Sequence, residues 1–203
     1  IEESWSLLFD PRQQPGPFLL LDSYREMIGA ALAYRGHSLN STDVRDLKAS
    51  RDLLLAVKRR ALGFEGSVGC VERVAAGQAV AAIAYNGDAV KRMADAPDTR
   101  FFVPREGSEI WVDNLAIPTR APHRDLALQF LNYILLPKVG ARQSNFSRYA
   151  TPNAAAKPLV NPADLNNPVI YPPPEIMRRL QFTEELGVQS RLYDEVWTVV
   201  KSR

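Results

Sequence analysis

Short apolar runs and helical periodicity alternate along the first part of the chain. The run Phe18–Leu21 predicts a buried strand. Apolar residues then recur at helical spacing as far as Leu32, and Gly36 ends that pattern. Ser23 precedes this helix and Glu26 follows three positions later, which is the spacing of a capping box. The segment is therefore expected to form a strand followed by a capped helix.

The same alternation continues towards the middle of the chain. Residues 42–60 predict a second amphipathic helix, and residues 71–76 predict a short one. The small and apolar run 79–85 is typical of a strand that is covered on both faces. Asp88 follows a turn and is expected to cap the next helix. Strands that alternate with helices predict an α/β architecture.

The second half of the chain shows weaker patterns. Residues 100–103 and 109–117 predict two further strands from their β-branched and aromatic content. Residues 122–137 predict a helix that is bounded by proline at both ends. Prolines concentrate in residues 151–174, which predicts a long wrapping connection. A last helical stretch, with one break, is expected over residues 175–200.

Composition and charge exclude several classes of protein. Hydrophobic residues make up 46% and charged residues 24%, which is ordinary for a globular chain and excludes a collagen-like or disordered one. The formal net charge of +2 is too balanced for nucleic-acid binding, so no nucleic-acid partner is expected. The single Cys70 cannot form an internal disulfide. The chain begins at Ile1 without a signal-type segment and is expected to be a processed, trimmed or excised product.

Six segments share an order and a spacing with one known family. They are Leu20–Glu26, Tyr85–Asp88, Trp111–Pro118, Phe130–Pro137, Tyr149–Asn153 and Tyr171–Pro173. Together they resemble the periplasmic polyamine-binding proteins of ABC import systems, of the spermidine/putrescine receptor type. The resemblance extends over essentially the whole chain from Trp5 onward.

The resemblance implies a periplasmic-binding-protein type II-like fold with two α/β lobes. Residues 1–109 and 158–203 would form the second lobe. Residues 110–157 would be a return segment that belongs to the first lobe, most of which is absent. The implied fold is therefore mainly the second lobe with part of the first.

A polyamine carries ammonium groups along an apolar chain, so its site needs carboxylates and aromatic faces. The resemblance implies six ligand-binding residues, which are Glu26, Tyr85, Asp88, Trp111, Asp113 and Tyr149. The three carboxylates would bind ammonium groups and the three rings would bracket the carbon chain. Trp111 and Asp113 are two positions apart on a predicted strand, so they are expected to share one face.

Most of these residues also have a simpler interpretation. Glu26 could only complete the capping box, and Asp88 could only cap a helix. Trp111 and Asp113 could form the end of a strand, and Tyr149 could pack under the proline-rich segment. All of these alternatives remain open on the sequence alone.

The resemblance implies a polyamine more clearly than it implies one particular polyamine. An acid at position 88 is typical of the putrescine-type receptors in the family, which favours a short diamine. Tyr85 stands where the family usually has tryptophan, and a tyrosine ring adds a hydroxyl group to a weaker cation-binding face. Ser23 stands where the family has an acidic or polar contact.

Other function classes have less support in the sequence. An enzyme is not expected, since His37, His123 and Cys70 form no recognisable catalytic pattern and no cluster has metal-ligand spacing. No cofactor and no metal are expected. The alternatives are a two-lobe binding protein for another solute, such as ferric iron, and a non-binding fragment or interaction module.

The resemblance also implies partners and a compartment. A polyamine receptor would deliver its ligand in the periplasm to the membrane permease of an ABC transporter. The missing N-terminal lobe, or a second chain in its place, is a further expected partner. A surface left exposed by that lobe would favour a domain-swapped dimer.

Overall fold

The computed structural model describes residues 2–202, in two units that the chain visits in alternation. Unit 1 contains the residues up to Ile110 and those from Pro173 onward, and unit 2 contains Trp111–Pro172. The chain therefore leaves unit 1 after Ile110 and re-enters it at Pro173.

The centre of unit 1 is a parallel three-stranded sheet in the order β2-β1-β3. Its strands are β1 (Phe18–Leu21), β2 (Phe64–Glu65) and β3 (Ala81–Ala82). Leu20 pairs with Phe64 on one side of β1, and Phe18 pairs with Ala81 on the other. Every residue of β1 is buried, which confirms the buried strand predicted from its apolar run.

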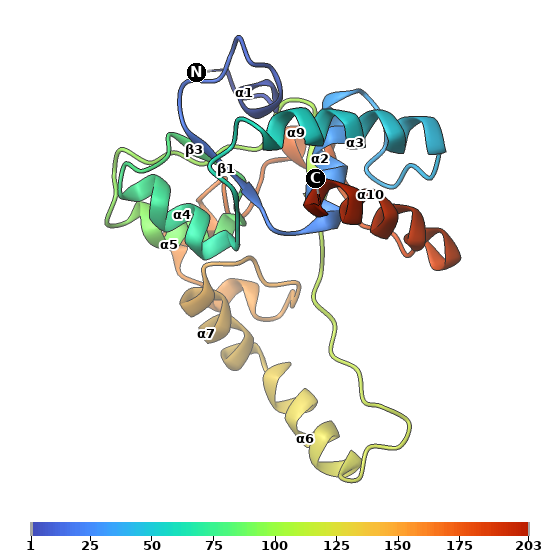
Figure 1. Cartoon of the computed structure of the whole chain (residues 1–203). Helices are drawn as coiled ribbons and strands as arrows, with labels where there is room; N and C mark the ends of the chain where they lie inside the picture. The colour runs from blue at the N-terminus through green and yellow to red at the C-terminus, as the bar shows by residue number, and fades with distance from the viewer. Residues whose placement is uncertain (1, 203) are drawn as a thin grey trace. The chain divides into compact units, whose positions relative to one another are not determined.

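Helices cover both sides of this sheet (Figure 1). One layer contains α2 (Tyr24–Tyr34), α3 (Val44–Lys58) and α10 (Ser190–Ser202). The other contains α4 (Ser67–Ala75) and α5 (Asn86–Met93). This arrangement follows from parallel pairing, because each crossover between parallel strands places a helix on a face of the sheet.

The core of unit 1 lies between β1 and the first helix layer. Leu20, Met27, Ile28, Leu32 and Leu54 are all fully buried there. Burial of an aliphatic side chain of this size contributes about 1.5–3 kcal/mol to the free energy of folding. The predicted apolar face of α2 is therefore the face that packs in the core of unit 1.

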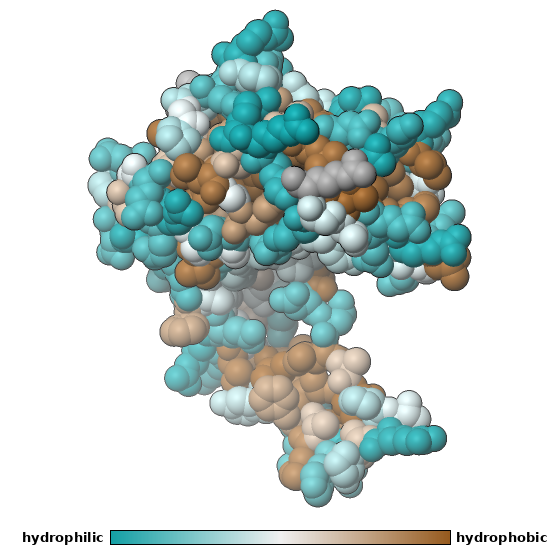
Figure 2. Space-filling view, viewed as in Figure 1, coloured by the Kyte–Doolittle hydropathy of each residue, from teal (hydrophilic) through white to brown (hydrophobic). Residues whose placement is uncertain are grey.

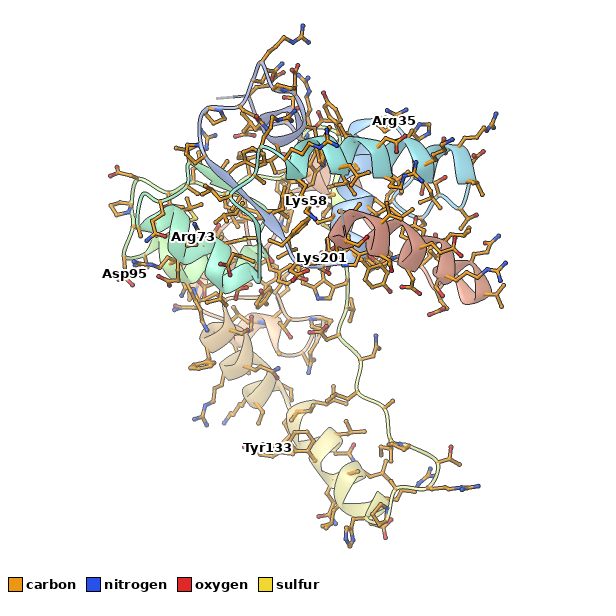
Figure 3. All side chains as sticks on the ribbon, viewed as in Figure 1. Arg35, Lys58, Arg73, Asp95, Tyr133 and Lys201 are labelled. Carbon is orange, nitrogen blue, oxygen red and sulfur yellow. The ribbon has the colours of Figure 1, made fainter. Side chains whose placement is uncertain are left out.

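The last helix is held to α3 by polar contacts as well as by packing. Lys58 Nζ donates hydrogen bonds to the carbonyl oxygens of Val200 (2.7 Å) and Lys201 (3.0 Å) near the end of α10, as a helix C-terminus favours. Lys201 Nζ in turn lies 2.8 Å from Asp22 Oδ1. Figure 3 labels both lysines on their helices.

A second, two-stranded parallel sheet joins the two parts of unit 1. It pairs β4 (Ser108–Ile110) with β5 (Leu180–Phe182), and Glu109 lies opposite Gln181. The turn after α2 holds β5 in place: Gln181 Oε1 accepts a hydrogen bond from the Ser38 hydroxyl (2.9 Å), and Asn40 Nδ2 donates to the Phe182 carbonyl (2.8 Å). This contact anchors the returning chain beside α2.

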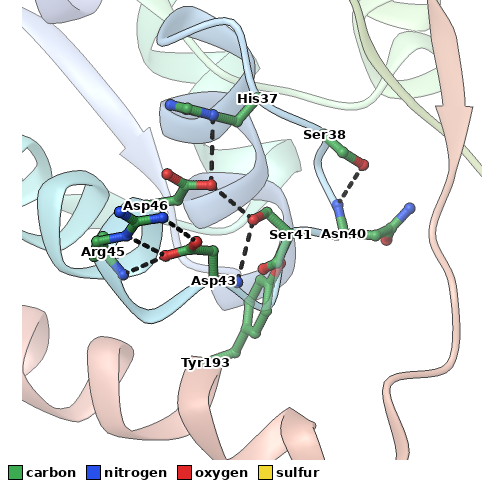
Figure 4. A network of polar contacts seen from close by, with 8 residues as sticks. All are labelled: His37, Ser38, Asn40, Ser41, Asp43, Arg45, Asp46 and Tyr193. Carbon is green, nitrogen blue, oxygen red and sulfur yellow. Dashed lines mark hydrogen bonds and ion pairs between the residues drawn. The ribbon is translucent and has the colours of Figure 1, made fainter.

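Polar contacts also order the turn between α2 and α3 (Figure 4). The Tyr193 hydroxyl lies 2.9 Å from the Leu39 carbonyl oxygen and 2.8 Å from that of Ser41. The Ser41 hydroxyl donates to Asp46 Oδ2 (2.9 Å), and the Asp43 carboxylate caps α3. Because Tyr193 is fully buried, the hydroxyl needs these acceptors.

Unit 2 consists mainly of helices. They are α6 (Arg124–Ile134), α7 (Pro137–Ser147), η1 (Lys157–Leu159) and α8 (Pro162–Leu165). The small core contains Ala141, Ala156 and Val160, with Leu165 and Tyr171 packed against it. The remaining short elements belong to unit 1 and are α1 (Ser6–Phe9), α9 (Pro174–Met177) and η2 (Gly187–Gln189).

Helix α6 leaves its hydrophobic side chains exposed, and hydrophobic atoms gather over it in Figure 2. The exposed large apolar residues on α6 and directly after it are Leu126, Leu128, Phe130, Tyr133, Leu135 and Leu136. Figure 3 shows the Tyr133 ring projecting from this helix. An apolar face of this extent marks an interaction surface or an aggregation hazard.

Several predicted elements differ from the structure. Residues 100–103 form no strand, and only Ala81–Ala82 of the run 79–85 and Ser108–Ile110 near the predicted strand 109–117 are paired. β-Branched and aromatic content favours a strand only where a partner strand is available. Two elements were not predicted from the sequence. Helix α7 begins at the proline that was expected to end α6, and strand β5 lies in the stretch predicted as the last helix.

The second boundary between the units also differs from the expected one. The return segment was expected to end at residue 157, whereas residues 158–172 belong to unit 2. The reason is packing, since Val160 and Tyr171 cover Ala141 and Ala156. The assignment of the units to the two lobes of the family stays a prediction.

Candidate ligand-binding site

The candidate site in unit 1 lies at the carboxyl ends of β1 and β3. These strands are neighbours in the sheet, and the chain leaves β1 towards β2 on one side and later reaches β3 on the other. In open parallel sheets, ligands bind at such a point of reversal. Glu26 follows β1 on α2, while Tyr85 and Asp88 follow β3 at the start of α5.

Glu26 and Tyr85 lie in direct contact. The Tyr85 hydroxyl donates a hydrogen bond of 2.6 Å to Glu26 Oε1, and the Ser23 hydroxyl donates to Glu26 Oε2. The predicted capping box is therefore wrong, because Ser23 uses its hydroxyl for the carboxylate and makes no side-chain bond to the helix backbone. Glu26 is thus held between two hydroxyl groups at the edge of the sheet.

Tyr85 is fixed by its own backbone as well. Its N–H donates to Ser67 Oγ at 2.8 Å, and it occupies the N-cap position of α5. Burial, and then the hydrogen bond to Glu26, raise the pKa of the Tyr85 hydroxyl, which therefore stays protonated as a donor. The ring is partly buried against the core of unit 1.

Asp88 lies in the first turn of α5 and is half-buried. The expectation that Asp88 caps this helix is wrong, because the helix already begins at Asn86. The positive end of the helix dipole favours a carboxylate in that first turn. Asp88 therefore adds a negative charge to the same edge of the sheet as Glu26.

Glu109 is a further carboxyl group near Glu26 that the sequence reasoning missed. It lies on β4, and its Oε2 accepts a hydrogen bond of 3.2 Å from the Thr183 hydroxyl just after β5. Burial, and then the charge of Glu26, raise the pKa of Glu109 to about 7. The only signal in the sequence was a carboxylate two positions before Trp111, directly before the apolar run Ile110–Val112.

The nearby arginine is engaged elsewhere. The Arg25 guanidinium donates to Asn40 Oδ1 (2.8 Å) and to the Glu184 carbonyl (3.2 Å), and lies 4.6 Å from the centre of the Tyr193 ring. In residues 2–202, the Arg25 guanidinium forms no ion pair with Glu26 or Glu109. Glu26 and Glu109 instead accept hydrogen bonds from neutral hydroxyl groups.

The other three predicted residues lie in unit 2. The rings of Trp111 and Tyr149 meet edge to face, with centroids 6.4 Å apart and an interplanar angle of 64°. Asp113 is exposed. The expectation that Trp111 and Asp113 share a strand face is wrong, because the chain has no regular structure over residues 111–118.

The described residues offer few groups for catalysis or metal binding. Cys70 is fully buried, and burial raises the pKa of its thiol to about 12, so the nucleophilic thiolate is disfavoured. His37 lies 3.4 Å from Asp46 in the turn before α3. Residues 2–202 contain no cluster of three or more histidine, cysteine or acidic side chains arranged to bind a metal ion. Among the same residues, no helix has the length and hydrophobicity for a transmembrane span.

Comparison with known protein families assigns the chain to one of them. Residues 3–172 match the family described as bacterial extracellular solute-binding protein. The chain belongs to this solute-binding family. Relatives include a putrescine-binding periplasmic protein of Pseudomonas aeruginosa (32% identical) and the putrescine-binding periplasmic protein PotF of Escherichia coli (34% identical), each aligned over 98% of this chain. The resemblance inferred from the sequence is thereby confirmed.

Solved structures show the same fold for this solute-binding family member. A chain from Listeria monocytogenes named after a spermidine/putrescine ABC transporter superposes with a TM-score of 0.90 at 30% identity, over 98% of this chain and 62% of that one. The substrate-binding protein PotD of Streptococcus pneumoniae gives 0.80 at 25% identity, over 99% and 62%. The predicted α/β periplasmic-binding-protein fold is confirmed. The chain spans 57% of the length of both named curated relatives.

Proposed function

We propose that this chain is the ligand-binding part of a polyamine-binding protein that serves an ABC importer. The observation that carries the proposal is the Glu26–Tyr85 pair, a carboxylate and an aromatic ring in hydrogen-bond contact beside two further carboxylates. A diammonium ligand supplies the positive charges and the methylene chain that such a site accommodates. The names of the relatives support the same class of ligand.

In this proposal the residues bind and orient a ligand, and no covalent bond changes. Glu26 and Asp88 accept hydrogen bonds from ammonium groups, while the Tyr85 ring packs against the carbon chain. Trp111, Asp113 and Tyr149 keep the aromatic and acidic roles that the resemblance implies for them. Closure of two lobes by a hinge is the usual way in which such proteins enclose a ligand. Putrescine is the proposed ligand, because an acid at Asp88 favours a short diamine.

The proposal extends to a partner for the exposed face of α6. The curated relatives are longer than this chain, and unit 2 has only a small core of its own. We propose that a first-lobe polypeptide covers the apolar side chains of α6 in the working protein, which acts in the periplasm with a membrane permease. A second copy of this chain is the competing occupant, and the oligomeric state in solution distinguishes the two.

The proposed function is tested by calorimetric titration of the chain with putrescine, spermidine and ferric citrate at pH 8. We expect putrescine to bind, and we expect Glu26→Gln to weaken its affinity by about ten- to a hundredfold, since a charged hydrogen bond contributes about 1.5–3 kcal/mol. Asp113→Asn should have a similar effect. Glu195→Gln is the matched control, because Glu195 is exposed on α10.

Three results would contradict the proposal or its assignment of Glu26. Binding of ferric iron in preference to either polyamine would identify a receptor for another solute. No binding of any of the three ligands would identify the chain as a non-binding fragment or an interaction module. An affinity for putrescine that Glu26→Gln leaves unchanged would remove Glu26 from the site.

A further inference from the structure

Glu109 comes within electrostatic reach of the Glu26–Tyr85 pair from a different part of the chain. Helix α2, which carries Glu26, packs against β4, which carries Glu109. The charge of Glu26 acts on Glu109, and the charge of Glu109 acts on the Tyr85 hydroxyl. Three segments that are distant in sequence thus bring two carboxyl groups and one phenol together.

The position of Glu109 is defined by its own contacts. Its backbone is paired with Gln181 in the β4–β5 sheet, and its Oε2 accepts the hydrogen bond from Thr183. The backbone just before β4 is also anchored, since the Trp5 ring N–H donates to the Gly107 carbonyl at 2.8 Å. The carboxyl group is therefore held in place and does not move freely in solvent.

The groups around Glu109 do not neutralise its charge. From α2 it faces the like charge of Glu26 and the smaller opposing effect of Arg25, whose guanidinium is bonded to Asn40. From the start of α5 it faces the neutral Tyr85 hydroxyl, and from the end of β5 the neutral Thr183 hydroxyl. Two half-buried carboxylates side by side are unfavourable until a cation enters or one of them takes up a proton.

We propose that Glu109 is a further cation-binding residue of the same site, and that it releases its proton to solvent when an ammonium group of the ligand binds. The inference rests on the proposed function and deepens it. In the free protein, the proton on Glu109 relieves the repulsion by Glu26. When a diammonium ligand binds, its ammonium group stays protonated and takes over that role, and the Glu109 proton passes to water. Ligand binding is thereby coupled to pH.

The coupling has a defined sign. Below the pKa of Glu109, which is about 7, the ligand must displace a proton, so its apparent affinity falls as the pH is lowered. The ionised fraction of such a group drops about tenfold between pH 8 and pH 6, and the affinity is expected to drop with it. The number of protons released per ligand bound should rise from about 0.1 at pH 8 to about 0.9 at pH 6.

The test is calorimetric titration of the chain with putrescine at pH 6, 7 and 8, in buffers that differ in their enthalpy of ionisation. The observed heat then depends on the number of protons released. Glu109→Gln should abolish proton release and flatten the pH dependence, and it should weaken binding at pH 8 by about tenfold or more. Glu109→Asp, which keeps the charge, should retain proton release. Glu195→Gln is the control for the loss of one negative charge.

The possible outcomes separate the inference from the proposed function. If the unmodified chain binds putrescine without releasing protons at pH 6, or if Glu109→Gln still releases them, the inference is wrong while the proposed function stands. If the unmodified chain binds no diamine at any of the three pH values, the proposed function fails and the inference fails with it. Circular dichroism of each variant establishes that the fold is retained.

Discussion

The carboxyl group of Glu109 should make the unliganded protein less stable as the pH rises. The folded protein raises the pKa of this group from 4.5 to about 7, through burial and then through the charge of Glu26. Between these two values the folded state binds more protons than the unfolded state, so the free energy of unfolding falls with increasing pH. The loss is absent below pH 4.5 and complete above about pH 7. Replacement by glutamine, which has the same shape and no charge, should remove this loss.

The size of the effect follows from the same values. A rise of the pKa from 4.5 to about 7 corresponds to about 3 kcal/mol, because a tenfold change in a proton equilibrium is about 1.4 kcal/mol. Solvent screens a carboxyl group that is only partly buried, so about 2 kcal/mol is a reasonable expectation. Glu109→Gln should therefore be more stable than the unmodified protein by about 2 kcal/mol at pH 8 and equally stable at pH 4.5.

Urea unfolding, followed by far-ultraviolet circular dichroism at pH 4.5, 6 and 8, measures this difference. The exposed Glu195→Gln should show no such dependence on pH. A Glu109→Gln protein that is less stable than the unmodified protein at pH 8 would refute the reasoning. So would a gain that is the same at all three pH values, since that gain could not come from ionisation.

The remaining predictions concern the fold. Gly107→Ala should lower the free energy of unfolding by about 3 kcal/mol or more, because Gly107 has φ +93° and an added Cβ would lie 2.2 Å from a backbone oxygen. Gly77→Ala, at φ +72° with open space around it, should lower it by about 1 kcal/mol in the same urea assay. Tyr193→Phe should lose about 1–2 kcal/mol, measured likewise, since it removes a buried hydroxyl that lies between two carbonyl oxygens. Phe130→Ser should lower the binding of a hydrophobic dye to the chain, because Phe130 is 57% exposed on α6; unchanged dye fluorescence would show that this face is covered in solution.

Predictions from the sequence were most successful where local pattern and tertiary structure coincide. The run Phe18–Leu21 forms the central strand, and the apolar face of the next helix is buried against it. Predictions failed where a strand needs a partner from far along the chain. Residues 100–103 have strand-like composition and no partner, while β5 has a helical pattern and pairs with β4. Strand pairing depends on what the rest of the fold brings alongside.

Predictions for the candidate site also succeeded in part and failed in part. Glu26 and Tyr85 could be named because the family resemblance implies them, and in the structure they lie in contact. Two expected capping interactions were wrong, because the Ser23 hydroxyl bonds to the Glu26 carboxylate and Asp88 lies within the first turn of α5. Their role towards a ligand stays a prediction.

The sequence by itself determined the order of strands and helices around β1 and the types of group at their ends. These properties are local, since hydrophobic periodicity and residue type can be read along a short segment. Only the tertiary structure decided that Glu109 lies beside Glu26 and that its pKa is raised to about 7. A pKa depends on burial and on charges that arrive from other segments, here through the pairing of β4 with β5 and the packing of α2 on β4. The charge of the site is therefore a property of the fold.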